Sequence, residues 1–204
     1  MLSIYGETGA LDDYDFRGRT DPEIVRALLR PLGYADARID RSLADLWMAY
    51  CEALERQLVE RRLALRVLPG VERLLDRFAD DDRIEMALVT GNVERGAWLK
   101  LGACGLDDRF AFGAFGSDSE SRSELPPIAI RRAEARTGER YLAEEVIVIG
   151  DTPDDIRCAR DSGLRVLSVA TGGHTREALQ RHSQDHLVDD LTDTAAILRL
   201  FEAP

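Results

Sequence analysis

The sequence is short of positive charge and of long apolar runs. Its 27 lysine and arginine residues stand against 38 aspartate and glutamate residues, which leaves a formal net charge of −11. A surface of that sign repels nucleic acid and anionic lipid, so we expect neither a nucleic-acid nor a membrane partner. No apolar run reaches the length that spans a membrane. An anionic substrate would need a local positive site.

Cysteine is also scarce and carries no metal pattern. Cys51, Cys104 and Cys158 are odd in number and widely spaced, and no CxxC or Cys/His arrangement is present. Such usage is typical of reduced thiols, so we predict a cytoplasmic protein. A chain of 204 residues has room for one domain with a full core and a small appended one.

The first third of the chain reads as helical. Residues 1–20 carry no convincing strand, and Asp21-Pro22 is typical of a helix start. A second helix from about Asp40 has a wide apolar stripe. The stripe comprises Leu43, Leu46, Trp47, Tyr50, Cys51, Leu54 and Leu58. Two helices with no strand between them predict a small helical subdomain over residues 1–66.

From residue 67 onward, short apolar strands alternate with amphipathic helices. Repeated alternation of this kind predicts an α/β domain over residues 67–204, Rossmann-like, with a parallel sheet and flanking helices. The predicted strands are 84–89, 110–115, 146–149, 165–170 and 186–188. The predicted helices are 71–78, 93–101, 127–136, one from 153, 175–182 and 192–201.

Carboxylates cluster directly after the most apolar of these strands. Residues 146–149 are followed by Gly150, then Asp151, then a helix start at Thr152-Pro153 that carries Asp154 and Asp155. Ligands of open α/β sheets bind beyond the carboxyl ends of strands. Carboxylate oxygens suit Mg²⁺, so we predict a metal site at Asp151 and Asp155. The alternative is that Asp154 and Asp155 only favour the helix dipole.

Two further polar stretches follow strands or lie in their loops. Thr90-Gly91-Asn92 combines a hydroxyl, a permissive backbone and a helix start, which together can hold a phosphate oxygen. The same three residues also make an ordinary turn. The polar loop 117–125 contains Arg122, which is either a ligand for an anion or a solvated surface residue.

These stretches together resemble the haloacid dehalogenase superfamily of phosphatases, in particular its phosphoglycolate-phosphatase-like branch, over nearly the whole chain. The resemblance implies a Mg²⁺-dependent hydrolase of small phosphorylated metabolites that works through an aspartyl-phosphate. It implies that Thr90 binds the transferring phosphoryl group, with Gly91 and Asn92, and that Asp151 and Asp155 hold Mg²⁺. The stretches are LVTGN (88–92), RSELPPIAI (122–130), IGDTPDDI (149–156) and VATGGHT (169–175), with FRGRTD (16–21) similar to the start of the branch's helical cap.

The sequence departs from the family in its third motif, which uses a lysine. Lys100 is the only lysine of the chain, and it lies in the predicted helix after the second motif. Arg122 is the nearest cation at about the expected position. Its planar guanidinium suits phosphate, so Arg122 is the candidate for this charge.

The second departure concerns the nucleophile, which in the family is the first Asp of a DxD motif after an apolar strand. Asp13-Tyr14-Asp15 has the right letters, but no apolar strand precedes it and FRGRTD follows at once. We therefore predict that the chain as given has no nucleophile and lacks the first core strand, which in the family lies between the strands of the second and fourth motifs.

A vacancy there would leave backbone groups of both flanking strands unpaired, at about 1–3 kcal/mol for each buried group. Either the two strands pair directly, or another segment fills the gap, or the native protein has an N-terminal extension, which we favour. The leading function is then a phosphatase whose nucleophile is absent from this chain. The alternatives are a catalytically inactive remnant that acts as a binding or interaction protein, and a haloacid dehalogenase. Substrate identity and oligomeric state are not predicted.

Overall fold

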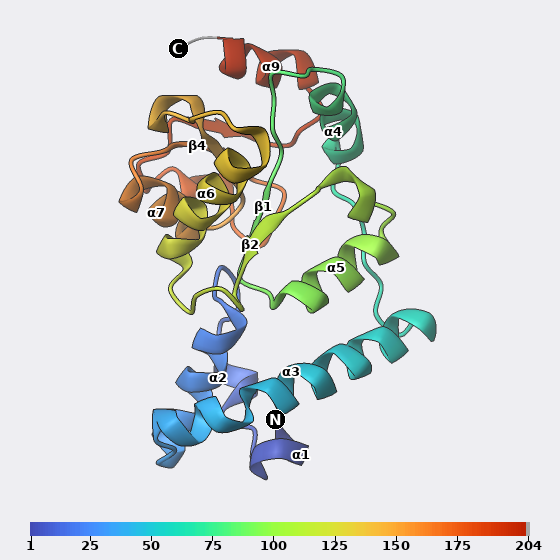
Figure 1. Ribbon diagram of the computed structural model, residues 1–204, viewed down its shortest axis with the longest axis vertical. Helices are drawn as coiled ribbons and strands as arrows, with labels where there is room; N and C mark the ends of the chain where they lie inside the picture. The colour runs from blue at the N-terminus through green and yellow to red at the C-terminus, as the bar shows by residue number, and fades with distance from the viewer. Residues whose placement is uncertain (203–204) are drawn as a thin grey trace. The chain divides into compact units, whose positions relative to one another are not determined.

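The computed structural model describes residues 1–202 (Figure 1). They form two compact units, and each is described here by itself. The first unit comprises residues 1–65, 90–107 and 115–122; the second comprises residues 66–89, 108–114 and the described residues from 123 onward. None of the helices in residues 1–202 combines the length and the apolar character needed to cross a bilayer.

The first unit is helical, as the sequence predicts for most of it. Thr20 begins its second helix: the residue is extended, and its hydroxyl accepts a hydrogen bond from the Glu23 N–H at 3.2 Å. Pro22 occupies the first turn, where a missing N–H costs nothing. The elements of this unit are α1 (Leu2–Tyr5), η1 (Leu11–Asp13), α2 (Asp21–Leu29), η2 (Arg30–Leu32), α3 (Asp36–Val59) and α5 (Glu94–Ala103).

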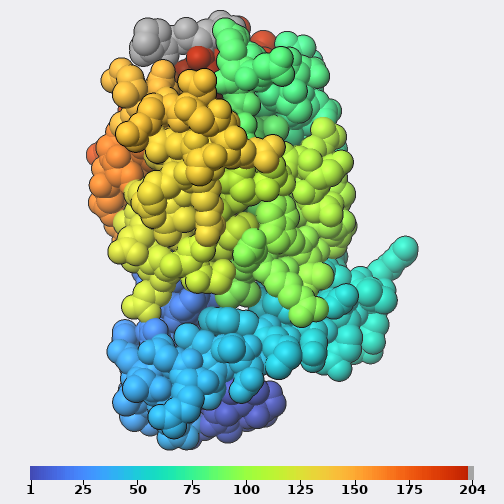
Figure 2. Space-filling model, in the orientation of Figure 1, coloured from blue at the N-terminus to red at the C-terminus, as the bar shows by residue number. Residues whose placement is uncertain are grey.

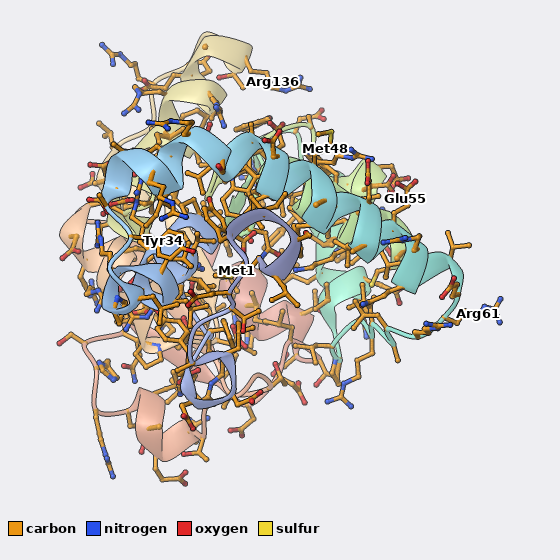
Figure 3. All side chains as sticks on the ribbon, turned by 90° about the horizontal axis from the view of Figure 1, so that it is seen from below. Met1, Tyr34, Met48, Glu55, Arg61 and Arg136 are labelled. Carbon is orange, nitrogen blue, oxygen red and sulfur yellow. The ribbon has the colours of Figure 1, made fainter. Side chains whose placement is uncertain are left out.

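A small core holds α1, α2 and α3 together. Val25, Leu29, Ile39 and Leu46 are buried in it with the aromatic pair of Tyr5 and Tyr34. In Figure 3, Tyr34 and Met1 lie on one side of α3, and Met48 and Glu55 lie on the other. The end of α3 and the residues that follow it, in teal, project from the surface (Figure 2), in keeping with the 78% exposure of Val59, the last residue of the helix.

The second unit contains a parallel three-stranded sheet with β4 in the middle. Strand β3 pairs with β4 from Ile147↔Arg165 to Gly150↔Ser168, and β5 pairs with β4 from Leu167↔His186 onward. The strands of the two sheets are β1 (Leu88–Thr90), β2 (Gly113–Phe115), β3 (Ile147–Gly150), β4 (Arg165–Val169) and β5 (His186–Val188). The remaining elements are α4 (Val71–Ala79), η3 (Asp107–Arg109), η4 (Arg122–Glu124), α6 (Leu125–Thr137), η5 (Ala143–Glu145), α7 (Pro153–Asp161), α8 (Arg176–Leu179) and α9 (Thr194–Glu202).

Alternate residues of β4 face opposite layers of helix. Leu167 and Val169 pack with α4 and α9, whereas Val166 packs with α7 and α8. Helices therefore cover both faces of the sheet, and the predicted α/β class is confirmed. The division into a cap (1–66) and a core (67–204) stays a prediction.

Within the described residues, β1 and β2 form a separate two-stranded sheet that does not pair with β3. A cavity of about 100 Å³ lies between Ala87 and Val89 on one side and Val146 and Val148 on the other. The two strands thus neither close up nor receive another described segment between them. Two predicted strands are shorter than expected: residues 84–87 lie outside β1, and residues 110–112 lie outside β2. The predicted helix 175–182 is also shorter, because α8 ends at Leu179.

Candidate functional site

The turn after β3 is built from its own residues. Strand β3 ends at Gly150, and Thr152 is the N-cap of α7. One oxygen of Asp155, Oδ2, accepts hydrogen bonds from the Asp151 N–H (3.1 Å), the Thr152 N–H (3.0 Å) and the Thr152 hydroxyl (2.8 Å). The Asp155 N–H donates in return to the Thr152 hydroxyl oxygen. This capping box is the helix-start role that the sequence offered as the alternative for Asp155.

Two glycines let the carboxylates of this turn pack closely. A Cβ on Gly150 would lie 2.3 Å from Cγ of Asp155, and a Cβ on Gly172 would lie 1.5 Å from Oδ2 of Asp151. The segment after β4 therefore lies directly against the Asp151 carboxylate. Asp155 is only 6% exposed and Asp151 is half-buried, at the carboxyl end of a parallel strand.

The donor set of this turn fits a hard divalent ion in part. Asp151 and Asp155 offer carboxylate oxygens, and Mg²⁺ is commonly held by one or two protein carboxylates with water and substrate oxygens. No group of three metal-ligating side chains occurs in the described residues. Asp154 is turned to its neighbour instead, with an ion pair of 2.6 Å to Arg157.

The turn after β1, Thr90-Gly91-Asn92, belongs to the first unit, and most of its hydrogen bonds come from residues elsewhere in that unit. One hydrogen bond lies within the turn: the Asn92 N–H donates to the Thr90 hydroxyl at 3.3 Å. Gly91 accepts from the Asp21 N–H at 2.7 Å, and the Asn92 carbonyl accepts from the Gly116 N–H at 2.8 Å. A Cβ on Gly91 would lie 2.1 Å from the backbone oxygen of Arg19, so only glycine fits there.

The Asp21 carboxylate is the main support of this turn. Its Oδ2 accepts from the Val93 N–H at 2.7 Å, at the start of α5, and its Oδ1 accepts from the Asn92 side chain at 3.3 Å. Burial raises the pKa of Asp21 above its ordinary 3.8, while the hydrogen bond from Val93, the Lys100 ammonium and the Asn92 amide act to lower it. An acidic group at a helix start is favoured by the helix dipole.

Lys100 completes the cluster. Its Nζ donates to Oδ1 of Asn92 at 2.8 Å and lies 6.0 Å from the centroid of the Tyr50 ring. Burial lowers the pKa of Lys100 below its ordinary 10.5, and Asp21 and Cys51 act to raise it. Burial, with a further contribution from Asp21, raises the pKa of Tyr50 to about 12. Neither Asp21 nor Lys100 was predicted as a site residue; the only signal in the sequence is that the single lysine lies on the helix that follows the Thr-Gly-Asn turn.

Arg122 begins η4 and is half-buried. Asp15 of the Asp-Tyr-Asp triplet pairs with Arg17 at 2.9 Å. Within the described residues the triplet follows η1 and no strand, as predicted. The structure thus gathers Thr90, Gly91 and Asn92 in one unit and Asp151 and Asp155 in the other.

A family model described as HAD-hydrolase-like matches residues 123–194. This segment contains the parallel sheet and the turn with Asp151 and Asp155. Over this segment the chain is similar to the haloacid dehalogenase-like hydrolases.

The chain is also similar to individual proteins over more of its length. It is 25% identical over 134 residues to a Caldanaerobacter subterraneus protein that carries the name pyrophosphatase PpaX. The match covers 66% of this chain and 59% of the relative, so the chain spans about three fifths of that protein.

Solved structures share the fold of this chain. A hydrolase from Pseudomonas syringae matches with a TM-score of 0.63 and 22% identity, over 90% of this chain and 79% of that one. The β-phosphoglucomutase of Clostridium difficile matches with a TM-score of 0.66 and 17% identity, over 91% and 78%. A protein titled a predicted phosphoglycolate phosphatase, from Haemophilus somnus, matches with a TM-score of 0.59 and 19% identity, over 86% and 74%.

Proposed function

We propose that this protein is a Mg²⁺-dependent phosphomonoester hydrolase of small phosphorylated metabolites, of the phosphoglycolate-phosphatase-like kind. The observation that carries the proposal is the turn after β3, where Asp151 and Asp155 follow the end of a parallel strand and the Asp155 carboxylate accepts from the Asp151 backbone N–H. The match of residues 123–194 to a HAD-hydrolase-like family model and the structural neighbours named as phosphatases support it.

The proposed roles follow from the chemistry of each group. Asp151 and Asp155 would hold the ion, which when bound supplies positive charge to the transferring phosphoryl group. The Thr90 hydroxyl and the backbone N–H groups of Gly91 and Asn92 would donate to phosphate oxygens, since the start of a helix favours an anion. Arg122 would add a planar cation. These donors stabilise the charge on the equatorial oxygens during in-line transfer.

The nucleophile of this proposal is an aspartate on a strand that pairs between β1 and β3. A cavity lined by Ala87 and Val89 of one sheet region and Val146 and Val148 of the other supports this placement. The added strand would pair with the backbone groups of β1 and β3. Its first aspartate would attack phosphorus and displace the alcohol of the ester, which would take a proton from the second aspartate of the DxD motif; water would then hydrolyse the aspartyl-phosphate, releasing phosphate and restoring the carboxylate.

Titration calorimetry with MgCl₂ tests the metal role in the chain as it stands. The change Asp151→Asn is expected to weaken Mg²⁺ binding by about tenfold or more. Asp154→Asn is the matched control: it removes one carboxylate of the same turn, one that is paired with Arg157, and should change affinity by about twofold at most. Equal affinity in the wild type and Asp151→Asn would show that the assignment is wrong.

Hydrolysis is tested with a chain extended at its N-terminus by an apolar strand that ends in DxD. This extended chain is expected to hydrolyse p-nitrophenyl phosphate with Mg²⁺ and to lose that activity in excess chelator. Undiminished hydrolysis in chelator would contradict a metal role for Asp151.

A second candidate function is a phosphate- or metal-binding protein without catalysis. The absence, in residues 1–202, of a strand before Asp13-Tyr14-Asp15 favours it. If the extended chain binds Mg²⁺ and inorganic phosphate but hydrolyses no ester, this second function is the correct one. Haloacid dehalogenation is a third and weaker candidate, because that chemistry needs no metal and gives Asp151 no role as a metal ligand.

A further inference from the structure

The only lysine of the chain points back along its own helix. In an α-helix each side chain leans toward the N-terminus. Lys100 lies near the end of α5, and its Nζ reaches Oδ1 of Asn92, just before the helix begins, at 2.8 Å. The side chain is half-buried and runs beside the ring of Tyr50.

The contact fixes which way the Asn92 amide faces. A lysine ammonium group only donates hydrogen bonds and a carboxylate only accepts them. The Asn92 oxygen must therefore face Lys100, and its Nδ2 must face Oδ1 of Asp21, as observed at 3.3 Å. Asp21 in turn accepts from the Val93 N–H and donates its own N–H to the Gly91 carbonyl.

Burying the charged groups of Lys100 and Asp21 costs folding free energy, which indicates a role for them beyond stability. Burial disfavours the charged form of both Lys100 and Asp21. Apolar groups of similar volume often stabilise a protein as well as or better than a buried ion pair. What an apolar pair would not provide is a fixed orientation for Asn92 and the adjoining backbone.

We propose that Lys100 is a positioning residue for the Thr90-Gly91-Asn92 turn, and that it acts through the Asn92 amide and the Asp21 carboxylate. The hydrogen bonds from Lys100 to Asn92, from Asn92 to Asp21 and from the Val93 N–H to Asp21 fix the orientation of the backbone N–H groups at the start of α5. For binding of a phosphoryl group, this inference rests on the proposed function; for the order of the turn itself, it does not.

The test compares the wild type with Lys100→Met, which keeps an unbranched side chain and removes the ammonium group. Arg95→Gln is the matched control, since Arg95 is an exposed cation on the same helix and pairs with Glu55 at 3.3 Å. Amide hydrogen exchange of Val93 reports the order of the turn, and inorganic phosphate is the probe for anion binding. Thermal unfolding shows whether each variant is folded.

We expect exchange of the Val93 amide to be about tenfold faster in Lys100→Met than in the wild type. Phosphate binding should be about tenfold weaker. Tenfold is the smaller end of the loss that follows when a residue supporting a ligand site from outside is removed. Arg95→Gln should change neither by more than about twofold. Unchanged exchange in a folded Lys100→Met would overturn the positioning role. Faster exchange in a protein that never binds phosphate would uphold that role and contradict the phosphate part of the proposed function.

A measurement on the unmutated protein covers the case in which Lys100→Met does not fold. Because Lys100 is the only lysine, ¹³C-lysine labelling gives a single Cε resonance. Its chemical shift as a function of pH measures the pKa of the Lys100 amine. Bound phosphate should raise the pKa of Lys100, since it adds negative charge to the turn. Saturation with phosphate that leaves this titration unmoved would overturn the proposal.

Discussion

The two turns of the candidate site are held in opposite ways. The turn after β3 is stabilised by residues within five positions of one another, since Asp155 bonds to Asp151 and Thr152. The turn after β1 is stabilised by residues far along the chain, above all Asp21, which lies 71 positions from Asn92. A local turn depends on its own sequence, whereas a turn braced from a distance depends on the fold around it.

This difference predicts where each turn is most vulnerable. A substitution inside the turn after β3 should act through lost capping bonds, which cost moderate amounts. A substitution in the turn after β1 should act through collision with the segments packed against it, because those segments are backbone and cannot rotate away. The three predictions below are ordered from the largest expected effect to the smallest.

Gly91→Ala should be the most damaging of the three changes. Its Cβ would lie 2.1 Å from the Arg19 backbone oxygen, and no side-chain rotation relieves that contact. We expect a loss of about 3 kcal/mol in the free energy of unfolding, measured by urea denaturation. Gly102→Ala on α5 is the control: its Cβ would meet nothing closer than 3.5 Å, and it should be neutral or stabilise by about 0.5 kcal/mol. Equal effects of the two changes would mean that the turn after β1 is not braced from outside.

Asp155→Ala should cost about 2 kcal/mol, because it strips an acceptor from the N–H groups of Asp151 and Thr152 and from the Thr152 hydroxyl. Asp154→Ala should cost less than about 1 kcal/mol, since the side chain of Arg157, its ion-pair partner, is 55% exposed and can be solvated without Asp154. Chemical denaturation of the two variants measures both. A larger loss for Asp154→Ala would contradict the view that Asp155 organises the turn.

The same difference explains what the sequence could and could not predict. The strand, predicted at 146–149 and found at 147–150, the N-cap at Thr152 and the helix start at Pro153 all depend on neighbouring residues, and they were predicted to within one residue. A helix-start role for Asp155 was foreseen only as the alternative to metal binding, and only through the helix dipole; its hydrogen bonds to the turn were not predicted. Both roles use carboxylate oxygens at a helix start, so residue type alone does not separate them.

The supports of the other turn were not predicted, because no local pattern marks them. Asp21 reads as an ordinary residue of a helix start, and Lys100 was placed only in the helix after the Thr-Gly-Asn turn. The contact of Asp21 with Asn92, 71 positions away, depends on how α2 packs within the first unit. The contact of Lys100 with Asn92 forms along α5 itself. The separation of β1 from β3 was foreseen as a vacancy, because it follows from the order of strands in the family and not from local pattern.

The smallest expected effect is a pH dependence of stability from Asp21. Burial raises the pKa of this carboxyl in the folded protein above its ordinary 3.8, so the folded state binds the proton more tightly than the unfolded chain does. The stability that this proton provides is complete below the unfolded pKa and is lost as the pH rises through the folded pKa. Asp21→Asn removes the titration, so the wild type should lose stability relative to this variant as the pH rises from about 4 toward neutrality. Urea denaturation at several pH values measures the difference, with Asp154→Asn as a control carboxylate in the other turn. A wild type that gains stability relative to Asp21→Asn over this range would show that hydrogen bonds, and not burial, dominate at Asp21.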